Sequence, residues 1–419
     1  MATTTQLRHP DASPQLLAPL ELPPVRYSLE TSISGGFTTE VYEAPVSAAV
    51  LDEVQPLWQE TFGADFAHER RVLAGECSQL TRDLLYVAHV DGALAATTVI
   101  TMGREGGGAV VLGGVGEVAT VPEFRGRGLA ATLVSLGRDD FSRLGGELLG
   151  LGTVNPAAAR VYRKAGFHRL GGCDAWYCNV RDSRTPEEYL VDSFRAARAA
   201  GPPRYVNGTG DAWPCHVAEG TAAERVSAMA LVHWVGASDD LLLDHNLELF
   251  SPRMETITSA MGVYNRYEAM REVFGGTWVT AHAPDGTLVG LATCMPGGGG
   301  PGSGDDEECC WVDAHIHRSF LGDWGALLGG ATGWASAQRR FTRVAVRVAA
   351  EDDAKRQRFA RHGFRPAGPD AAGGRALSLP LAHSVGGEDR QVELVVLEMA
   401  LATPGGGPRP PPTPGGPRL

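Results

Sequence analysis

The sequence lacks the features that mark membrane, secreted or disulfide-rich proteins. No apolar stretch reaches the roughly 18 residues that a membrane-spanning helix needs, and segment 1–24 has no charged region followed by an apolar run, as a signal peptide would. The seven cysteines form no CxxC pair and no regular framework, which favours reduced thiols over disulfides. We therefore expect a soluble, cytoplasmic protein without membrane association.

Basic charge is also scarce. The 37 Lys and Arg residues against 49 Asp and Glu residues give a formal net charge of −12. A nucleic-acid-binding protein needs a basic face to neutralise phosphates, so we expect no nucleic-acid partner. The acidic balance is compatible with a cationic small-molecule substrate, although solubility alone is the simpler explanation.

Length and composition predict two folded domains. A chain of 419 residues exceeds what one hydrophobic core usually serves. Pro- and Gly-rich segments mark both ends, and a helix-like stretch with early acids and late arginines lies in the middle. The expected organisation is a flexible segment 1–26, a first, catalytic domain 27–180, a linker helix 181–203, a second domain 204–402 and a disordered tail 403–419.

The pattern of the first domain predicts an α+β (mixed α/β) fold. Two apolar runs, 84–90 and 93–102, flank Asp91-Gly92, a hairpin signal. An antiparallel meander followed by alternating strands and helices implies a mixed central sheet with helices on both faces. The elements expected after the hairpin alternate between strand and helix: 109–121, 126–144, 147–153, 156–165 and 167–180.

A glycine-rich turn, RGRGLA at residues 125–130, joins the long expected strand to a helix. Gly126 and Gly128 leave little side-chain bulk at the mouth of the helix, so the free N–H groups of its first turn can bind an anion. Arg125 and Arg127 add positive charge. Alone, the turn suits a pyrophosphate but is also compatible with a tight turn that carries surface arginines, and it is neither a GxGxxG fingerprint nor a Walker loop.

A second segment, NPAAARVYRKAGF at residues 155–167, follows the next expected strand. Together the two segments resemble the GNAT superfamily of acetyl-CoA-dependent N-acetyltransferases, whose pattern is R/Q-x-x-G-x-G/A followed by N-x-x-A-x-x-x-Y-x-x-x-G-F. The resemblance covers about residues 37–180 and implies the GNAT fold there. Every position of the pattern is matched, by Arg125, Gly128, Ala130, Asn155, Ala158, Tyr162, Gly166 and Phe167.

This resemblance implies an acyl-CoA co-substrate, most simply acetyl-CoA. Asn155 would help to hold the cofactor near its pantetheine arm, although an Asn before a proline is also an ideal helix N-cap. The residues implied to bind the pyrophosphate through their backbone are Arg125, Gly126, Arg127, Gly128, Leu129 and Ala130. Those implied to pair with the pantetheine arm are Val118, Ala119, Thr120 and Val121.

Two catalytic residues are expected. By the same resemblance Tyr162 would protonate the departing thiolate, since a phenol stays protonated at neutral pH; packing beneath the sheet is the alternative. The acceptor amine must be neutral to attack, which calls for a base. Glu117 is the nearest acidic candidate, but a shift of one residue in register would turn it to the far face of the sheet, and a strand-end carboxylate without a catalytic role is equally expected.

Residues 204–402 repeat the order of elements without the motif. A tryptophan at the helix mouth would block a phosphate, and a phenylalanine has no proton to donate. We therefore expect a non-catalytic, degenerate GNAT-like domain, for which completion of the acceptor pocket is one available role. Alignment of the two halves places Ser319, Gly322, Trp324, Asp352 and Phe359 at the positions of Arg125, Gly128, Ala130, Asn155 and Tyr162.

Asp313, His315 and His317 alternate along one expected strand face. Three such ligands permit a metal, but no further ligand is identifiable, so contact with solvent or acceptor is the favoured interpretation. We expect no metal.

The sequence thus predicts an N-acyltransferase that acts on a primary amine of a small molecule by direct attack in a ternary complex, since no Cys or Ser is placed by motif as a nucleophile. A non-catalytic CoA-binding sensor or scaffold is one alternative, and an acyl-CoA decarboxylase or hydrolase on the same fold is another. The amine, the acyl chain and the choice between monomer and homodimer are left open.

Overall fold

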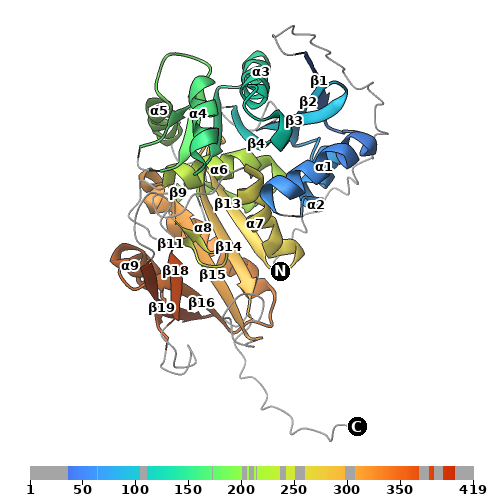
Figure 1. The fold of residues 1–419 in the computed structure, drawn as a ribbon. Helices are drawn as coiled ribbons and strands as arrows, with labels where there is room; N and C mark the ends of the chain where they lie inside the picture. Colours follow the sequence, from blue (N-terminus) through green and yellow to red (C-terminus); the bar gives the residue numbers. More distant parts are fainter. Residues whose placement is uncertain are drawn as a thin grey trace, which may run out of the picture.

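The expected mixed α/β class is confirmed by the computed structural model, in which helices flank two mixed sheets (Figure 1). Segments 1–26 and 403–419 lie outside the described residues, and the domain boundaries stay a prediction. No helix in the described part of the chain is long and apolar enough to cross a membrane, and the seven cysteines are free and buried. The structure describes residues 36–63, 65–103, 111–171, 173–200, 205–206, 212–213, 215–235, 242–250, 260–297, 307–367, 377–381 and 390–401.

The first sheet has seven strands in the order β1-β2-β3-β4-β5-β7-β6. Its one parallel pair is β4 with β5, and its other neighbouring pairs are antiparallel. The strands are β1 Phe37–Glu43, β2 Thr81–Val90, β3 Ala93–Gly103, β4 Leu112–Thr120, β5 Leu148–Gly152, β6 His168–Arg169 and β7 Ala175–Asn179.

Helices cover both faces of this sheet. Because side chains alternate along a strand, Leu85 and Val87 of β2 pack with α1 whereas Leu84 and Tyr86 pack with α3 and α4. A further helix, α5, runs between the two sheets in sequence. The helices are α1 Ala48–Phe62, α2 Ala67–Arg71 with the π-helical turn Val72–Glu76, α3 Leu129–Arg143, α4 Pro156–Lys164 and α5 Pro186–Ala199.

The second sheet repeats this topology in the order β10-β13-β14-β15-β16-β19-β17, with β18 paired to β19. Its parallel pair, β15 with β16, again lies at the centre. Its strands are β10 His216–Glu219, β13 Thr277–His282, β14 Leu288–Pro296, β15 Cys309–Ile316, β16 Arg343–Ala349, β17 Arg365–Pro366, β18 Leu377–Leu381 and β19 Arg390–Ala400.

Between β10 and β13 the second half has two helices, as the first half has between β1 and β2. A small insertion, β11 with β12, separates them. Two further short strands, β8 and β9, pair with each other. These elements are α6 Arg225–Val235, α7 Ala260–Glu272, α8 Trp324–Ala337, α9 Asp353–Arg361, β8 Tyr205–Val206, β9 Ala212–Trp213, β11 Leu242–Asp244 and β12 Leu249–Phe250.

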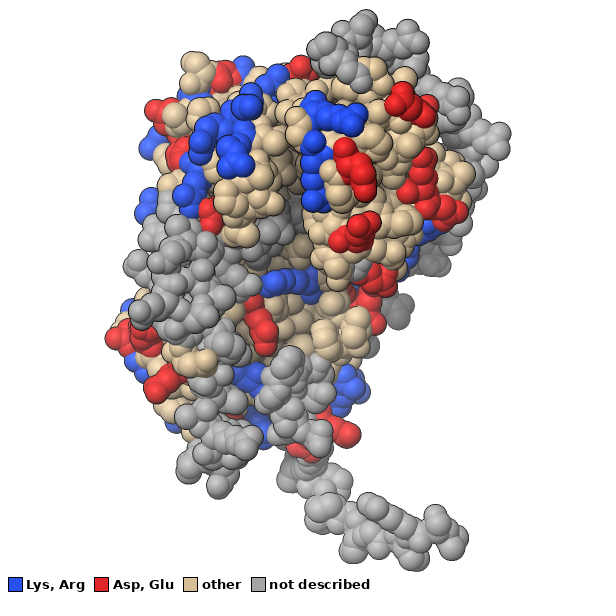
Figure 2. Space-filling model, viewed as in Figure 1, with Lys and Arg blue, Asp and Glu red and all other residues tan. Residues whose placement is uncertain are grey.

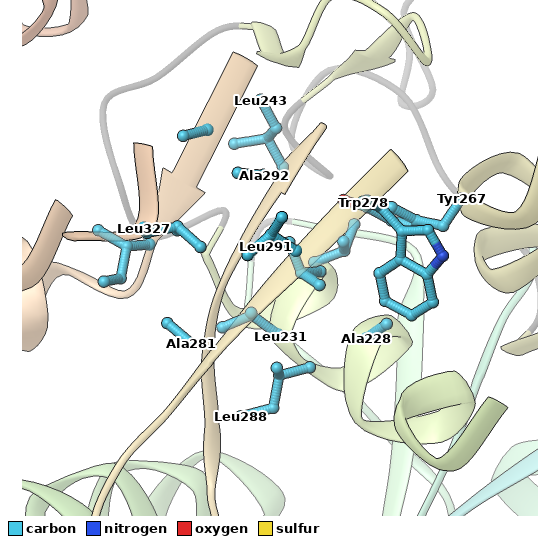
Figure 3. Close-up of a cluster of buried hydrophobic side chains, with 14 of the residues drawn as sticks. Ala228, Leu231, Leu243, Tyr267, Trp278, Ala281, Leu288, Leu291, Ala292 and Leu327 are labelled. Carbon is cyan, nitrogen blue, oxygen red and sulfur yellow. The ribbon is translucent and has the colours of Figure 1, made fainter. Parts of the chain in front are cut away.

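Helix α6 is buried between the two sheets. Toward the second sheet, Ala228 and Leu231 of α6 join the core around Trp278 and Leu291, with Tyr267 of α7 beside the indole (Figure 3). The same hydrophobic cluster continues into side chains of β5, β7 and α5 of the first half. A helix that is apolar on nearly all sides, RVSAMALVHWV, suits this position.

Toward the first sheet, α6 crosses a single row of strand residues. Arg225, its first residue, forms a buried ion pair with Asp83, and His233, two turns later, has Nδ1 at 2.8 Å from the Tyr177 hydroxyl. The two glycines of the row have no side chains, which leaves room for the helix to cross. Strand pairing aligns the row as Asp83, Thr101, Gly114, Gly150 and Tyr177.

We expect Gly150→Ala to destabilise the protein. A β-carbon there would lie 2.2 Å from Cε1 of Tyr177, so the ring, whose hydroxyl is hydrogen-bonded to His233, must shift, at a cost of about 1–3 kcal/mol in the free energy of unfolding. Urea denaturation measures the change. Gly329→Ala is the matched control, since nothing lies within 4 Å of its added carbon in α8, and a small stabilisation is expected there. Equal stability of both variants would contradict this packing.

Candidate active site

Strand β4 carries a bulge at Glu117. Between Thr97 and Val99 of β3, β4 has one residue more than its partner. Glu117 has a φ of 48°, in the left-handed region that non-glycine residues seldom adopt. The Thr97 hydroxyl donates to the Glu117 carbonyl at 2.8 Å and accepts from the Trp58 indole N–H at 2.8 Å. These buried hydrogen bonds hold the bulge in place.

The two central parallel strands separate before the bulge. β4 pairs with β5 only as far as Gly114, and no described strand continues the ladder on that edge. The residues expected to face the pantetheine arm lie on this open part: Val118 and Thr120 are half-buried, Ala119 is buried in the core beneath α1, and Val121 follows the strand. An extended ligand with its own amide groups can pair with such an edge as an added strand.

The glycine-rich turn leaves the mouth of α3 open. Gly126 and Gly128 have φ values of 80° and 85°, and nothing in the structure lies within 4 Å of a β-carbon built on either. α3 begins at Leu129, whose side chain is buried, with Ala130 half-buried behind it and no side-chain cap. Among the described residues no acceptor bonds the N–H groups of residues 126–131. Free N–H groups at a helix N-terminus form an anion site.

Both arginines of the turn are exposed. Arg125 Nε donates to the Thr120 carbonyl at 3.0 Å, so its side chain braces the turn against the end of β4. The Arg127 guanidinium lies 5.2 Å from the centroid of the Phe124 ring. Their charges therefore stay beside the helix mouth.

A furrow runs between α3 and α4 on the surface, and Lys and Arg side chains gather on both of its sides (Figure 2). The basic side chains beside the furrow give a local excess of positive charge in a chain whose net charge is −12, which favours an anionic ligand there. A separate hollow of about 410 Å³ lies beside α4 and is lined by Arg160, Arg163 and Arg169 together with Asp174, which pairs with Arg169.

Helix α4 places the second motif at the furrow. Asn155 is the N-cap, because its side-chain oxygen accepts from the Ala157 N–H at 2.9 Å; this capping interpretation is confirmed and leaves the other side of the exposed amide toward solvent. Tyr162, two turns further, is buried with its ring 6.0 Å from that of Phe167. Helix α4 thus holds the Tyr162 side chain in the protein interior and the Asn155 side chain at the surface of the furrow.

The structure brings Glu117 and Tyr162 together. Burial raises the pKa of Tyr162, and the charge of Glu117 raises it further, which keeps the phenol protonated. Burial raises the pKa of Glu117 to about 8; the charges of Glu69 and Asp83 add to this, and Arg225 opposes it. A carboxyl whose pKa lies near neutrality can take up and release a proton under working conditions.

Three of these neighbours were missed by sequence reasoning. Glu69 on α2, Asp83 on β2 and Arg225 on α6 belong to no motif, and the ion pair between the last two joins residues 142 positions apart. The one available signal was an arginine at the start of a long apolar run, 225–235, which is unusual for a surface helix.

In the second half the equivalent gap is filled by the chain. β15 pairs with β16 only from Cys309 to Trp311, yet Lys355 of α9 reaches across to Asp313 of β15 at 2.7 Å and donates to the carbonyls of Leu242 and Leu243 at 2.7 and 2.9 Å. β14 and β15 pair without a bulge. The space that corresponds to the open edge of β4 is therefore occupied in the second half by Lys355 and β11.

At the helix mouth of the second half, Trp324 is buried and its indole N–H lies 3.4 Å from the Ala314 carbonyl. Phe359 packs edge-on against it at 4.8 Å between centroids. The two residues at the positions of Ala130 and Tyr162 therefore form a hydrophobic contact where the first half has an open furrow.

The expectation that Asp313, His315 and His317 contact solvent or acceptor is wrong. All three are buried, Asp313 beneath Lys355 of α9 and the segment that follows β11, and His317, just beyond β15, beneath α5. Asp313 accepts from the backbone N–H of His245 at 2.8 Å besides pairing with Lys355, and His317 stacks on Phe194 at 4.0 Å. Among the described residues no His, Cys, Asp or Glu cluster suited to a metal is found.

Comparison with known proteins matches residues 50–167 to the model of the acetyltransferase (GNAT) family. No curated protein matches the chain. Similar solved structures include a ribosomal-protein-alanine N-acetyltransferase from Brucella melitensis (16% identity, 44% of this chain, 99% of that chain, TM-score 0.33) and a spermidine N-acetyltransferase from Vibrio cholerae in complex with CoA and spermine (10%, 45%, 95%, 0.33). These values are too low to transfer a functional property.

We expect Glu117→Gln to remove a pH-dependent loss of stability. The folded pKa of about 8 lies above the ordinary 4.5, so the wild-type carboxyl contributes fully below pH 4.5, and its contribution is lost as the pH rises through 8, at about 1.4 kcal/mol per pKa unit. Thermal denaturation at pH 5, 7 and 9 should show the variant gaining on the wild type as the pH rises. Parallel curves would contradict the buried, protonated carboxyl.

Proposed function

Residues 50–167 belong to the GNAT family of acetyltransferases, and from this we propose that the chain is an acyl-CoA-dependent N-acyltransferase acting on a primary amine of a small molecule. One observation carries the proposal. The charge of Glu117 acts on Tyr162 where β4 and β5 have separated, and the open N-terminus of α3 follows from the same end of β4. A base, an acid and an anion site are thus combined in one furrow.

On the donor side, acyl-CoA supplies an activated thioester. The N–H groups of residues 126–131 bind its pyrophosphate, and Arg125 and Arg127 contribute charge beside them. The open edge of β4 at residues 118–121 pairs with the pantetheine arm, and the exposed amide of Asn155 contacts the arm from the rim. A backbone N–H on this edge can stabilise the negative charge that develops on the thioester oxygen.

On the acceptor side, Glu117 takes the proton that an ammonium group must lose before its nitrogen attacks. The nitrogen forms the new bond to the acyl carbon as the carbon–sulfur bond breaks. Tyr162 gives a proton to the sulfur, so one proton leaves the amine and one arrives at the thiol. The attack is direct, in a ternary complex, and the furrow contributes mainly by holding both substrates together.

The test of this function is a thiol-release assay over a library of primary amines with acetyl-, propionyl- and malonyl-CoA. We expect at least one amine to accelerate thiol release and to appear as its amide in mass spectrometry. Thiol release that needs no amine would instead indicate a hydrolase or decarboxylase. Tight CoA binding without release from any donor would indicate a sensor and refute the transferase.

We expect Tyr162→Phe to lower kcat by about 100-fold while the Kd for CoA stays unchanged, since general acid catalysis contributes about that much. Stopped assays give kcat, and calorimetry gives Kd. Tyr86→Phe is the matched control, because that hydroxyl binds Asp140 at 2.8 Å beneath α3 and should affect stability alone. An unchanged kcat in the Tyr162 variant would remove the phenol from the mechanism.

A further inference from the structure

The carboxyl of Glu117 lies among three other charged groups that the motif does not include. Helices α6 and α7 pack against β4, the strand that carries Glu117, and the charges of Glu69 on α2, Asp83 on β2 and Arg225 on α6 all act on its carboxyl. From α4 the neutral phenol of Tyr162 completes the set. Among the described residues the set comprises three carboxyls and one cation, Arg225, which comes from the second half.

Arg225 is entirely buried. One of its terminal nitrogens forms the ion pair with Asp83 and donates to the Thr81 hydroxyl at 2.9 Å, and its guanidinium lies 6.0 Å from the centroid of the Tyr264 ring on α7. Nε and Nη1 have no hydrogen-bond partner among the described residues. A buried cation with two unsatisfied donors is costly for stability, which argues against a purely structural role.

The second half also holds the other carboxylate of the cluster. Asn265 of α7 donates to Glu69 at 2.8 Å. Both acids beside Glu117 are therefore anchored by residues of α6 and α7, the helices that cover this face of the first sheet. If the halves separated, Glu117 would lose Arg225, the one cation that acts on it among the residues the structure describes, and both anchored carboxylates would be free to turn to solvent.

We propose that Arg225 is a positioning residue of the active site, through which the second half sets the charge balance around Glu117. This inference rests on the proposed function, in which Glu117 is the base. A positive charge near a carboxyl favours its ionised form, and a negative charge opposes it. Arg225 therefore keeps Glu117 able to ionise in spite of burial and of the two nearby acids.

The direction of the effect on the pKa of Glu117 can be tested by removing the cation in one variant and an anion in another. In Arg225→Met the cation is lost, so the pKa of Glu117 should rise and the ascending limb of kcat/KM against pH should move upward by about 1 pH unit or more. In Asp83→Asn an anion is lost, so the limb should move downward. Arg225→Lys retains the charge and should restore the wild-type limb. A merely structural role would lower the rate without these opposite displacements.

A double variant that removes both charges of the Arg225–Asp83 ion pair distinguishes a folding defect from an effect on the pKa of Glu117. If Arg225→Met does not fold, the double variant Arg225→Met/Asp83→Asn removes both charges together, and its limb should still move upward because the arginine acts more strongly on Glu117 than Asp83 does. Arg71→Met is the control for docking: it breaks the exposed ion pair of Arg71 with Glu272 across the same interface, at 3.1 Å, and should leave the limb in place.

A readout without turnover separates this inference from the proposed function. The pH above which Glu117→Gln gains no further stability over its parent reports the pKa of Glu117 in the folded protein, whether or not an amine is acylated. We expect that pH to be higher in the Arg225→Met background than in the wild type. If this pH is unchanged, the role of Arg225 is refuted. If this pH is displaced but no amine is acylated, only the proposed transferase activity is refuted.

Discussion

The bulge at Glu117 is the constraint on which the rest of the site depends. One extra residue bends β4 and places a carboxylate in a left-handed conformation, at a cost of about 1–3 kcal/mol. The cost is met by buried hydrogen bonds from Trp58 through Thr97 to the carbonyl of Glu117. With β4 displaced, its ladder with β5 stops, an unpaired edge faces the furrow, and the mouth of α3 opens beside it.

The second half shows the same topology without this constraint. β15 pairs regularly with β14, so no residue is turned into the gap, and the gap is occupied by β11 and Lys355. Lys355 stands where the first half has Ala158, and Trp324 where it has Ala130. With larger side chains at these two positions and the inserted β11, the second half has a packed core where the first half has an open furrow, while the strand order is preserved.

Sequence alone predicted the parts of the fold and site that depend on local pattern. The mixed sheet, the glycine turn and the helix carrying Tyr162 follow from periodicity and from residues a few positions apart. The side of the sheet that Glu117 faces did not follow, because a bulge is one residue in one strand and leaves no composition signal. Arg225 and the course of α6 depend on contacts across more than a hundred residues, which no pattern in residues 204–276 encodes.

Helix α6 connects the two halves more closely than a flexible linker connects two independent domains. Its apolar face is part of the second core, through Ala228 and Leu231, while Arg225 at its start reaches the acids beside Glu117. If the two halves moved apart, the apolar face of α6 would be exposed and the guanidinium of Arg225 would leave the acids beside Glu117. The same packing that stabilises the second half therefore sets the electrostatics of the first, and this gives a physical reason for a half that lacks the glycine-turn motif to be retained.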